Sequence, residues 1–154
     1  MTSPLRLCVR RSAASDSREA ATLVTLRLPS DVQCIEEAVE LVTRHCLAGH
    51  DATQTIRFRL RVVLSEALSN AIIRGNCEDC SKWVDVRAEL AADAIRVYVT
   101  DEGSGFDPAS IPEPISPEQL DEASGRGLFL IRKLVDAVQF NAQGNSICMI
   151  LRRS

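Results

Sequence analysis

The sequence is poor in aromatic residues and contains no long apolar run. Phe, Trp and Tyr together make up 4% of the 154 residues, so we expect a core built from Leu, Val, Ile and Ala. No apolar stretch approaches the ~20 residues that a membrane-spanning helix needs, and the chain is not expected to be integral to a membrane. With 45% hydrophobic and 25% charged residues, the composition is typical of one globular domain.

An excess of positive charge is also missing. The formal net charge is −3, and although arginines cluster near the amino terminus, no basic stripe interleaved with aromatic side chains follows. Proteins that bind nucleic acid through its phosphates usually have such a basic surface. The sequence therefore argues against direct binding to nucleic acid.

Residues 1–20 are rich in Arg, Ser and Ala, and their first acidic residue is Asp16. This composition superficially suggests a transit peptide. The apolar patch is short, however, and no cleavage pattern is clear. We expect a disordered tail here, followed by a single domain over residues 21–154.

The six cysteines lack the arrangement of a disulfide framework. They are scattered along a chain with an ample core, which is more typical of a cytosolic protein with reduced thiols. Cys34, Cys46 and Cys148 fall within apolar patterns, and we expect them in the core. Cys77 and Cys80 form a C-x-x-C without the second pair that a structural zinc site needs. We interpret this pair as part of a loop, with metal binding or redox chemistry as the alternative.

Apolar periodicity predicts the order strand, two helices, two strands, long loop, helix, two strands. Helical spacing follows Ser30 and Asp51, each with a Gln three residues later in a capping-box pattern, and begins again at Leu128. This order predicts an α+β fold: a two-layer sandwich in which about three helices cover one face of a mixed, mostly antiparallel sheet. The strand regions are 21–29, 84–90, 95–99 and a closing hairpin over 137–153.

Three polar residues lie at successive i, i+4 positions of the second predicted helix. Glu66, Asn70 and Arg74 therefore project from roughly one helical face, distinct from the centre of the apolar stripe. Taken alone, this face is better explained as a solvated edge with a Glu-to-Arg charge pattern.

Two glycine-containing segments come later in the chain. The first, at a strand end, holds Asp101, Gly103 and Gly105, and its glycines permit positive φ and a close approach of the backbone to a ligand. The second holds Gly125 and Gly127 just before a helix, where free N–H groups and the positive helix end favour an anion. Together they indicate a nucleotide site.

Residues 106–124, between these two segments, hold four of the six prolines and show no sustained periodicity. A loop this long inside a compact domain is usually functional, and we expect a lid that closes over a ligand. A tolerated surface insertion is the alternative.

Common nucleotide-binding signatures are absent, since the sequence has neither G-x-x-x-x-G-K-[ST] nor G-x-G-x-x-G. Instead, E-x-x-x-N on a helix, D-x-G-x-G at a strand end and G-x-G at a helix start follow one another around the predicted lid. This combination resembles the Bergerat ATP-binding fold of gyrases, heat-shock chaperones, histidine kinases and mismatch-repair proteins. The segments LSEALSNAIIRGN and SGRGLFLIRKLVD are similar to the stand-alone anti-sigma-factor serine/threonine kinases of bacterial partner-switching systems.

The resemblance implies a cytoplasmic kinase that uses ATP and Mg²⁺. Such a kinase binds a sigma factor and phosphorylates a serine or threonine on a small anti-sigma-factor antagonist, and family analogy also suggests a homodimer. Two other functions stay open. One is a catalytically weak or inactive, nucleotide-sensitive protein-interaction switch, and the other is a detached histidine-kinase ATP domain.

The resemblance also implies roles for the motif residues. Glu66 would act as general base for the substrate hydroxyl, and Asn70 would offer its amide oxygen to Mg²⁺. Asp101 would accept a hydrogen bond from the exocyclic amine of adenine. Gly103 and Gly105 would keep the adenine pocket open.

Residues at the start of the third helix would line the phosphates, with an arginine adding charge. Three features depart from the family pattern, and one of them is the C-x-x-C of Cys77 and Cys80. Arg74 stands where many relatives have a histidine, and it would contact phosphate or form an ion pair. Cys148 stands where a threonine is common in the last strand, which would weaken a polar contact near adenine. The residues implied in lining the phosphates are Gly125, Arg126, Gly127 and Leu128.

Overall fold

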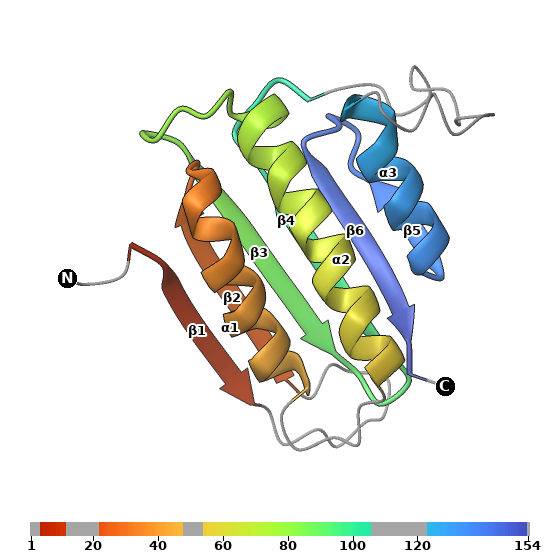
Figure 1. The fold of residues 1–154 in the computed structure, drawn as a ribbon. Coiled ribbons are helices and arrows are strands. Elements are labelled where there is room, and N and C mark those ends of the chain that lie inside the picture. The colour runs from red at the N-terminus through yellow and green to blue at the C-terminus, as the bar shows by residue number, and fades with distance from the viewer. Residues whose placement is uncertain (1–3, 12–21, 48–53, 106–122, 154) are drawn as a thin grey trace.

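The structure, a computed structural model, describes residues 4–11, 22–47, 54–105 and 123–153. Within these residues, six strands form one sheet in the order β1-β2-β3-β4-β6-β5, and every neighbouring pair is antiparallel. Helices α1, α2 and α3 lie on one face of this sheet (Figure 1). The arrangement confirms the predicted α+β two-layer sandwich. The elements are β1 (Arg6–Arg11), β2 (Thr22–Pro29), α1 (Ile35–Leu47), α2 (Gln54–Asn70), β3 (Trp83–Leu90), β4 (Ala94–Thr100), α3 (Ala123–Leu134), β5 (Ala137–Phe140) and β6 (Ser146–Arg152).

The central strands form because apolar residues alternate with polar ones along them. On β3, Val84, Val86 and Leu90 are buried, whereas Asp85 and Arg87 are exposed. Successive side chains of a strand point to opposite faces of the sheet. A single alternating run therefore decides which face of β3 carries the core and which carries charge.

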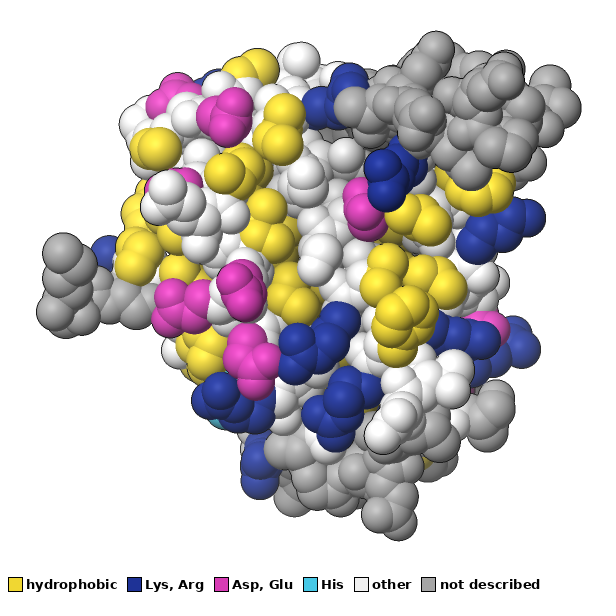
Figure 2. Space-filling model, in the orientation of Figure 1, with side chains coloured by type: hydrophobic (Ala, Val, Ile, Leu, Met, Phe, Trp, Pro, Cys, Tyr) yellow, Lys and Arg dark blue, Asp and Glu magenta, His cyan; other side chains and the backbone are white. Residues whose placement is uncertain are grey.

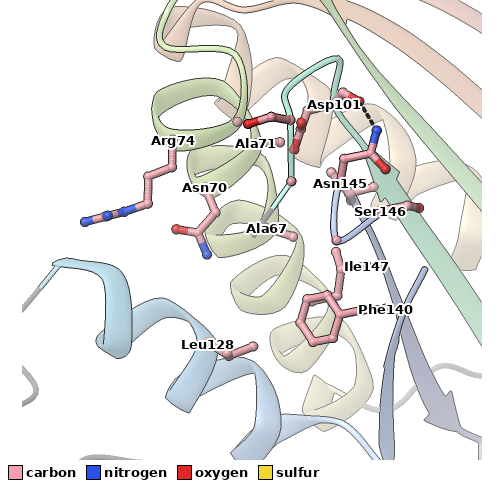
Figure 3. Close-up of a pocket in the computed structure, with 15 residues that line it drawn as sticks. Ala67, Asn70, Ala71, Arg74, Asp101, Leu128, Phe140, Asn145, Ser146 and Ile147 are labelled. Carbon is pink, nitrogen blue, oxygen red and sulfur yellow. Dashed lines mark hydrogen bonds between the residues drawn. The ribbon is translucent and has the colours of Figure 1, made fainter. Parts of the chain in front are cut away.

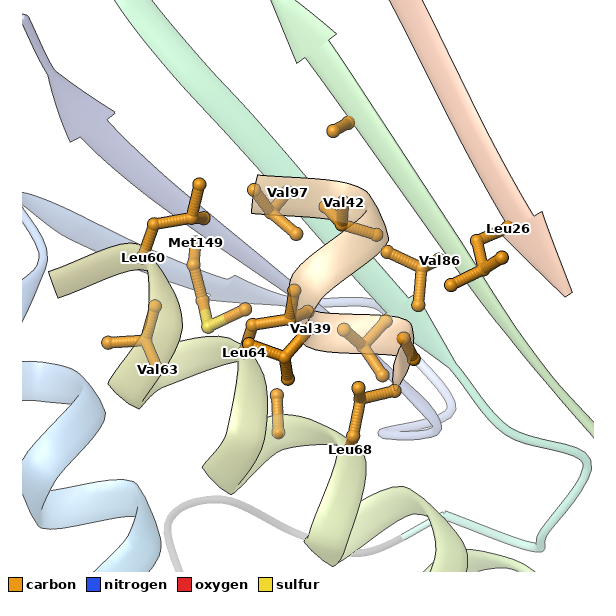
Figure 4. Packing of buried hydrophobic residues seen from close by; sticks show 14 of the residues in the cluster. Leu26, Val39, Val42, Leu60, Val63, Leu64, Leu68, Val86, Val97 and Met149 are labelled. Carbon is orange, nitrogen blue, oxygen red and sulfur yellow. The ribbon is translucent and has the colours of Figure 1, made fainter. Parts of the chain in front are cut away.

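The core lies between the helices and the sheet and is aliphatic, as the scarcity of aromatic residues predicts (Figure 4). Leu60, Leu64 and Leu68 of α2 are fully buried in the same cluster as Val97 of β4 and Met149 of β6. Burial of one leucine side chain contributes about 1.5–3 kcal/mol. Helix α2 is thus anchored along its length, and its polar face is held in a fixed orientation.

The start of the first helical segment differs from the capping box predicted at Ser30. Asp31 is the capping residue, and its carboxylate accepts a hydrogen bond from the Gln33 N–H at 2.9 Å at the start of a 3-10 turn, η1 (Val32–Cys34). Ser30 is fully buried, and its hydroxyl donates to the carbonyl of Lys82 at 2.9 Å. Both residues are good capping types, so sequence alone does not separate them.

Residues 1–20 are not a disordered tail throughout, because Arg6–Arg11 form the edge strand β1. This strand pairs with β2 over its whole length, from Arg6 opposite Arg27 to Arg11 opposite Thr22. Most of its side chains are exposed, but Val9 packs against the core. The alternation of Leu5, Leu7 and Val9 with polar residues indicates the strand, although the prediction did not use it. The Arg6 and Arg27 guanidinium groups also lie 5.6 and 5.0 Å from the Trp83 ring centroid, within the range of cation–π attraction.

The cysteines occupy the two environments that the sequence predicts. Cys34, Cys46 and Cys148 are buried, and burial raises the pKa of Cys46 to about 12. Cys77 and Cys80 are exposed in the loop between α2 and β3, and all six thiols are free. No helix in the described ranges has the length and apolar character required to cross a bilayer. The predicted lid falls almost wholly on residues 106–122, which lie outside the described residues.

Candidate nucleotide-binding site

A cavity of about 310 Å³ opens between α2, α3 and the β5–β6 hairpin (Figure 3). This volume lies within the range of small-molecule sites. Residues predicted to bind a nucleotide reach it from three separate segments of the chain. They are Asn70, Arg74, Asp101, Gly105 and Leu128.

Helix α2 delivers two of these residues through an unusual last turn. The α-helix ends at Asn70 and continues as a π-helical turn, η2 (Ala71–Gly75), closed by a hydrogen bond from the Asn76 N–H to the Ala71 carbonyl at 2.9 Å. Such wide turns are frequent at functional sites. Asn70 is half-buried at the cavity, whereas Arg74 is exposed and extends outward in Figure 3.

Glu66 lies one helical turn before Asn70 and faces α3 with it. A Cβ atom built on Gly127 would lie 2.9 Å from Glu66 Oε2 and 3.2 Å from Asn70 Nδ2. Glu66 and Asn70 therefore share a face of α2, as their spacing predicts. Glycine at 127 allows α3 to approach this polar pair.

Asp101 lies at the carboxyl end of β4, half-buried beside the cavity. Its Oδ1 accepts a hydrogen bond from the Gly103 N–H at 2.8 Å. Burial raises the pKa of the Asp101 carboxyl, while the Gly103 N–H and the positive charge of Lys82 act in the opposite direction. The group is a hydrogen-bond acceptor in a partly dry setting, where pairing with a ligand donor is favoured.

The glycines near Asp101 are needed for two different reasons. A Cβ on Gly103 would overlap the Gly75 carbonyl, and a Cβ on Gly75 would overlap the Asp101 carboxyl. Gly103 is thus required for close packing against η2 rather than for positive φ, which corrects the prediction. Gly105 does have a positive φ, +84°, as predicted. Gly75, which the sequence analysis did not assign to the site, also lines the cavity.

Helix α3 begins earlier than the sequence predicts. Gly125 and Gly127 lie inside the helix, which starts at Ala123, rather than ahead of it. The buried Gly127 explains this, because packing against α2 outweighs the poor helix propensity of glycine. Leu128 is buried and lines the cavity, and Arg126 is exposed.

The β5–β6 hairpin supplies cavity residues that the sequence analysis missed. Phe140, Asn145, Ser146 and Ile147 line the cavity, and the Ser146 hydroxyl lies 2.7 Å from the Thr100 hydroxyl. The sequence could have indicated them, because these residues flank the predicted hairpin turn, which lies at the same end of the sheet as Asp101.

Cys148 does not face the cavity, contrary to the expectation that its thiol replaces a polar contact near adenine. It pairs with Tyr98 across the β4–β6 ladder, whereas the neighbouring Met149 belongs to the core beneath the helices. Alternation along the strand therefore points Cys148 to the other face of the sheet. Ser146 lies on the same face of the strand as Cys148, and its hydroxyl is paired with the Thr100 hydroxyl.

Comparison with known proteins gives consistent matches. The sequence profile of the histidine kinase-like ATPase domain matches residues 28–151. The serine-protein kinase RsbW of Oceanobacillus iheyensis is 32% identical over 97 residues, 59% of this chain and 61% of the relative. RsbW of Bacillus subtilis is 33% identical over 98 residues, 58% of this chain and 61% of the relative. RsbW of Staphylococcus aureus is 25% identical over 134 residues, 82% of this chain and 84% of the relative. The chain thus matches less than two thirds of the length of the first two relatives.

Proposed function

Because the chain belongs to the histidine kinase-like ATPase domain family, we propose that it is an ATP-dependent serine/threonine protein kinase and anti-sigma factor. Its substrate is a small antagonist protein, and its second partner is a sigma factor that the unphosphorylated antagonist displaces. One observation carries the proposal: Asn70 and Asp101, from two separate motifs, line the same cavity, and Glu66 lies next to Asn70 against Gly127 of α3. The names of the RsbW relatives support a protein-serine substrate.

The polar pair on α2 fits a magnesium–phosphate site. Hard oxygen ligands suit Mg²⁺, and the Asn70 amide lies next to the Glu66 carboxylate beside Gly127. Asn70 would hold the ion through its amide oxygen. Bound magnesium supplies charge neutralisation for the ATP phosphates during transfer.

Glu66 is the group that we assign to proton transfer. In phosphoryl transfer, the substrate hydroxyl oxygen forms a bond to the γ-phosphorus while the bond to the β-phosphate bridging oxygen breaks, releasing ADP. The Glu66 carboxylate accepts the hydroxyl proton as this occurs. Its half-buried position on a well-anchored helix keeps it oriented toward the cavity side of α3.

Asp101 is the residue that we assign to base recognition. Its free carboxylate oxygen would accept a hydrogen bond from the exocyclic amine of adenine, because the other oxygen already binds the Gly103 N–H. Guanine has a carbonyl oxygen at the equivalent position, and a carboxylate repels it. A site built around such an acceptor selects ATP over GTP.

The partner surface that we propose is the helix-covered face around α1, together with the lid. Figure 2 shows hydrophobic, basic and acidic side chains interspersed over this face. Val32 before α1 and Ile73 at the end of α2 are exposed at 41% and 45%. Exposed apolar side chains with a charged surround are typical of a protein contact. A cytoplasmic location and a homodimer complete the proposal.

The test is phosphoryl transfer from γ-labelled ATP with magnesium to total protein of the source cells. We expect one small protein to gain acid-stable phosphate on serine or threonine, identified by mass spectrometry. Glu66→Gln is expected to lower the rate by about 10²-fold or more, whereas Glu89→Gln on β3 is the matched control. Equal transfer by wild type and Glu66→Gln would refute the kinase assignment. Acid-labile phosphate would instead indicate a histidine acceptor.

A further inference from the structure

The peptide group between Asp101 and Glu102 is held at both of its ends by asparagine side chains. Asn76 Oδ1 accepts a hydrogen bond from the Glu102 N–H at 2.8 Å. Asn145 Nδ2 donates to the Asp101 carbonyl oxygen at 3.0 Å, a contact drawn in Figure 3. The backbone that carries the Asp101 side chain is thus fixed from two sides, by residues far apart in the sequence.

Asn76 is a buried anchor on the helix side. It is fully buried, and its Nδ2 donates to the Ser30 hydroxyl at 2.8 Å and to the Trp83 carbonyl at 3.0 Å. Both its donors and its acceptor are therefore used, which fixes the orientation of the amide. This one side chain joins the end of α2 to the starts of η1 and β3 and to the segment after β4.

Asn145 is a half-buried anchor on the hairpin side. Its Oδ1 accepts from Asn141 Nδ2 at 2.6 Å, and its backbone carbonyl accepts from the Asp101 N–H at 2.9 Å. Asn141 Oδ1 in turn accepts the N–H groups of Gly144, Asn145 and Ser146. These hydrogen bonds hold the tip of the hairpin in one conformation. Through its two hydrogen bonds to the Asp101 backbone, Asn145 fixes Asp101 relative to the hairpin.

We propose that Asn76 and Asn145 are positioning residues that fix the Asp101 carboxylate and so set the preference for adenine over guanine. The inference rests on the proposed function, in which Asp101 reads the exocyclic amine. A carboxylate held in one place accepts from the adenine amine and repels the guanine carbonyl oxygen. When the peptide group is free to rotate, the carboxylate can turn away from the guanine carbonyl oxygen. The preference for ATP over GTP then falls more than the affinity for nucleotides in general.

The test measures the dissociation constants of ATP and GTP for wild type, Asn145→Ala, Asn76→Ala and the double variant. Asn145→Ala removes one hydrogen bond to this peptide group. We expect its dissociation constant for ATP to rise about three- to tenfold, with little change in its dissociation constant for GTP. Both side chains hold the same peptide group. The factor by which the double variant raises the dissociation constant for ATP should therefore be smaller than the product of the factors of the two single variants. Gln139→Ala, exposed on β5, is the control.

Asn145→Ala decides the outcome, because Asn76 also satisfies buried groups and its removal endangers folding. Thermal unfolding confirms that each variant is folded. An unchanged ratio of GTP to ATP constants in folded Asn145→Ala would overturn the inference while leaving the proposed function intact. Failure of wild type to bind ATP would overturn both, so the two failures are distinguishable.

Discussion

The carboxyl group of Asp101 occupies the space that a side chain on Gly75 would need. Gly75 ends the π-helical turn after α2, and Asp101 directly follows β4. The helix layer and the sheet therefore meet beside the cavity at these two residues. A substitution at 75 has to move the residue that we assign to adenine recognition.

Gly75→Ala is expected to weaken ATP binding about tenfold or more while the protein stays folded. The added methyl group displaces the Asp101 carboxyl, and overpacking of this kind costs about 1–3 kcal/mol. Calorimetric titration with ATP and a thermal melt measure the two effects. Ser69→Ala, near the end of α2, is expected to behave as wild type. Wild-type affinity in Gly75→Ala would mean that the carboxyl group moves without losing its role.

Asp101→Asn is expected to stabilise the fold at neutral pH and to abolish ATP binding. Burial raises the pKa of Asp101, so its folded-state pKa lies above the unfolded one. The ionised carboxylate then destabilises the fold at neutral pH, and this cost disappears as the pH falls through the folded-state pKa. Asparagine keeps an acceptor for the Gly103 N–H. Urea unfolding between about pH 7 and pH 4 should show the gap between variant and wild type closing on acidification. A less stable variant at neutral pH contradicts this account.

Gly127→Ala is expected to impair phosphoryl transfer without destabilising the protein. The new methyl group would lie within 3.2 Å of both Glu66 and Asn70, so that one of these side chains has to shift. Alanine favours a helix over glycine by about 1 kcal/mol, which offsets the crowding. Single-turnover transfer and thermal unfolding test the two parts separately. Lys133→Ala, which removes a contact with the Phe129 ring on the same helix, serves as control. Full activity in Gly127→Ala would argue against Glu66 and Asn70 as the reacting pair.

Leu64→Ala is expected to lower the free energy of unfolding by about 2–5 kcal/mol, because it opens a cavity in the aliphatic core. Arg61→Ala, on the same helix, removes an ion pair with Glu40 that joins α2 to α1 at 2.6 Å. Both partners are exposed, and exposed ion pairs contribute little. Urea titration should therefore move the midpoint far more for Leu64→Ala. A comparable shift for Arg61→Ala would show that the α1–α2 contact depends on charge.

The parts of the fold that sequence predicts are those with a repeating burial pattern. Val84 to Leu90 and the leucines of α2 alternate or recur because one face of each element is buried, and both were predicted. The alternation of Leu5, Leu7 and Val9 with Arg6, Cys8 and Arg10 does indicate the strand β1, but the sequence analysis missed it because this run lies in a segment rich in Arg, Ser and Ala. The start of α3 was misplaced because glycine usually ends helices, whereas Gly127 is present for close packing.

The candidate site divides in the same way. Glu66, Asn70 and Asp101 were predicted because their spacing forms recognisable motifs. Asn76 and Asn145 were not, because single asparagines in loops carry no periodicity and their role depends on which segments the fold brings together. Cys148 was assigned to the cavity because its sequence position was known but its strand face was not.

The π-helical turn at Ala71–Gly75 makes the number of residues in this segment part of the site. Because an i→i+5 turn already holds one residue more than an α-helical turn, insertion of a further residue there would rotate everything beyond it by roughly 100° about the helix axis. Asn76 would then leave Glu102, and Gly75 would leave Asp101. Apart from Gly75, this stretch is therefore expected to accept changes of residue type more readily than an insertion, so that insertions should be rarer here than substitutions as the sequence diverges.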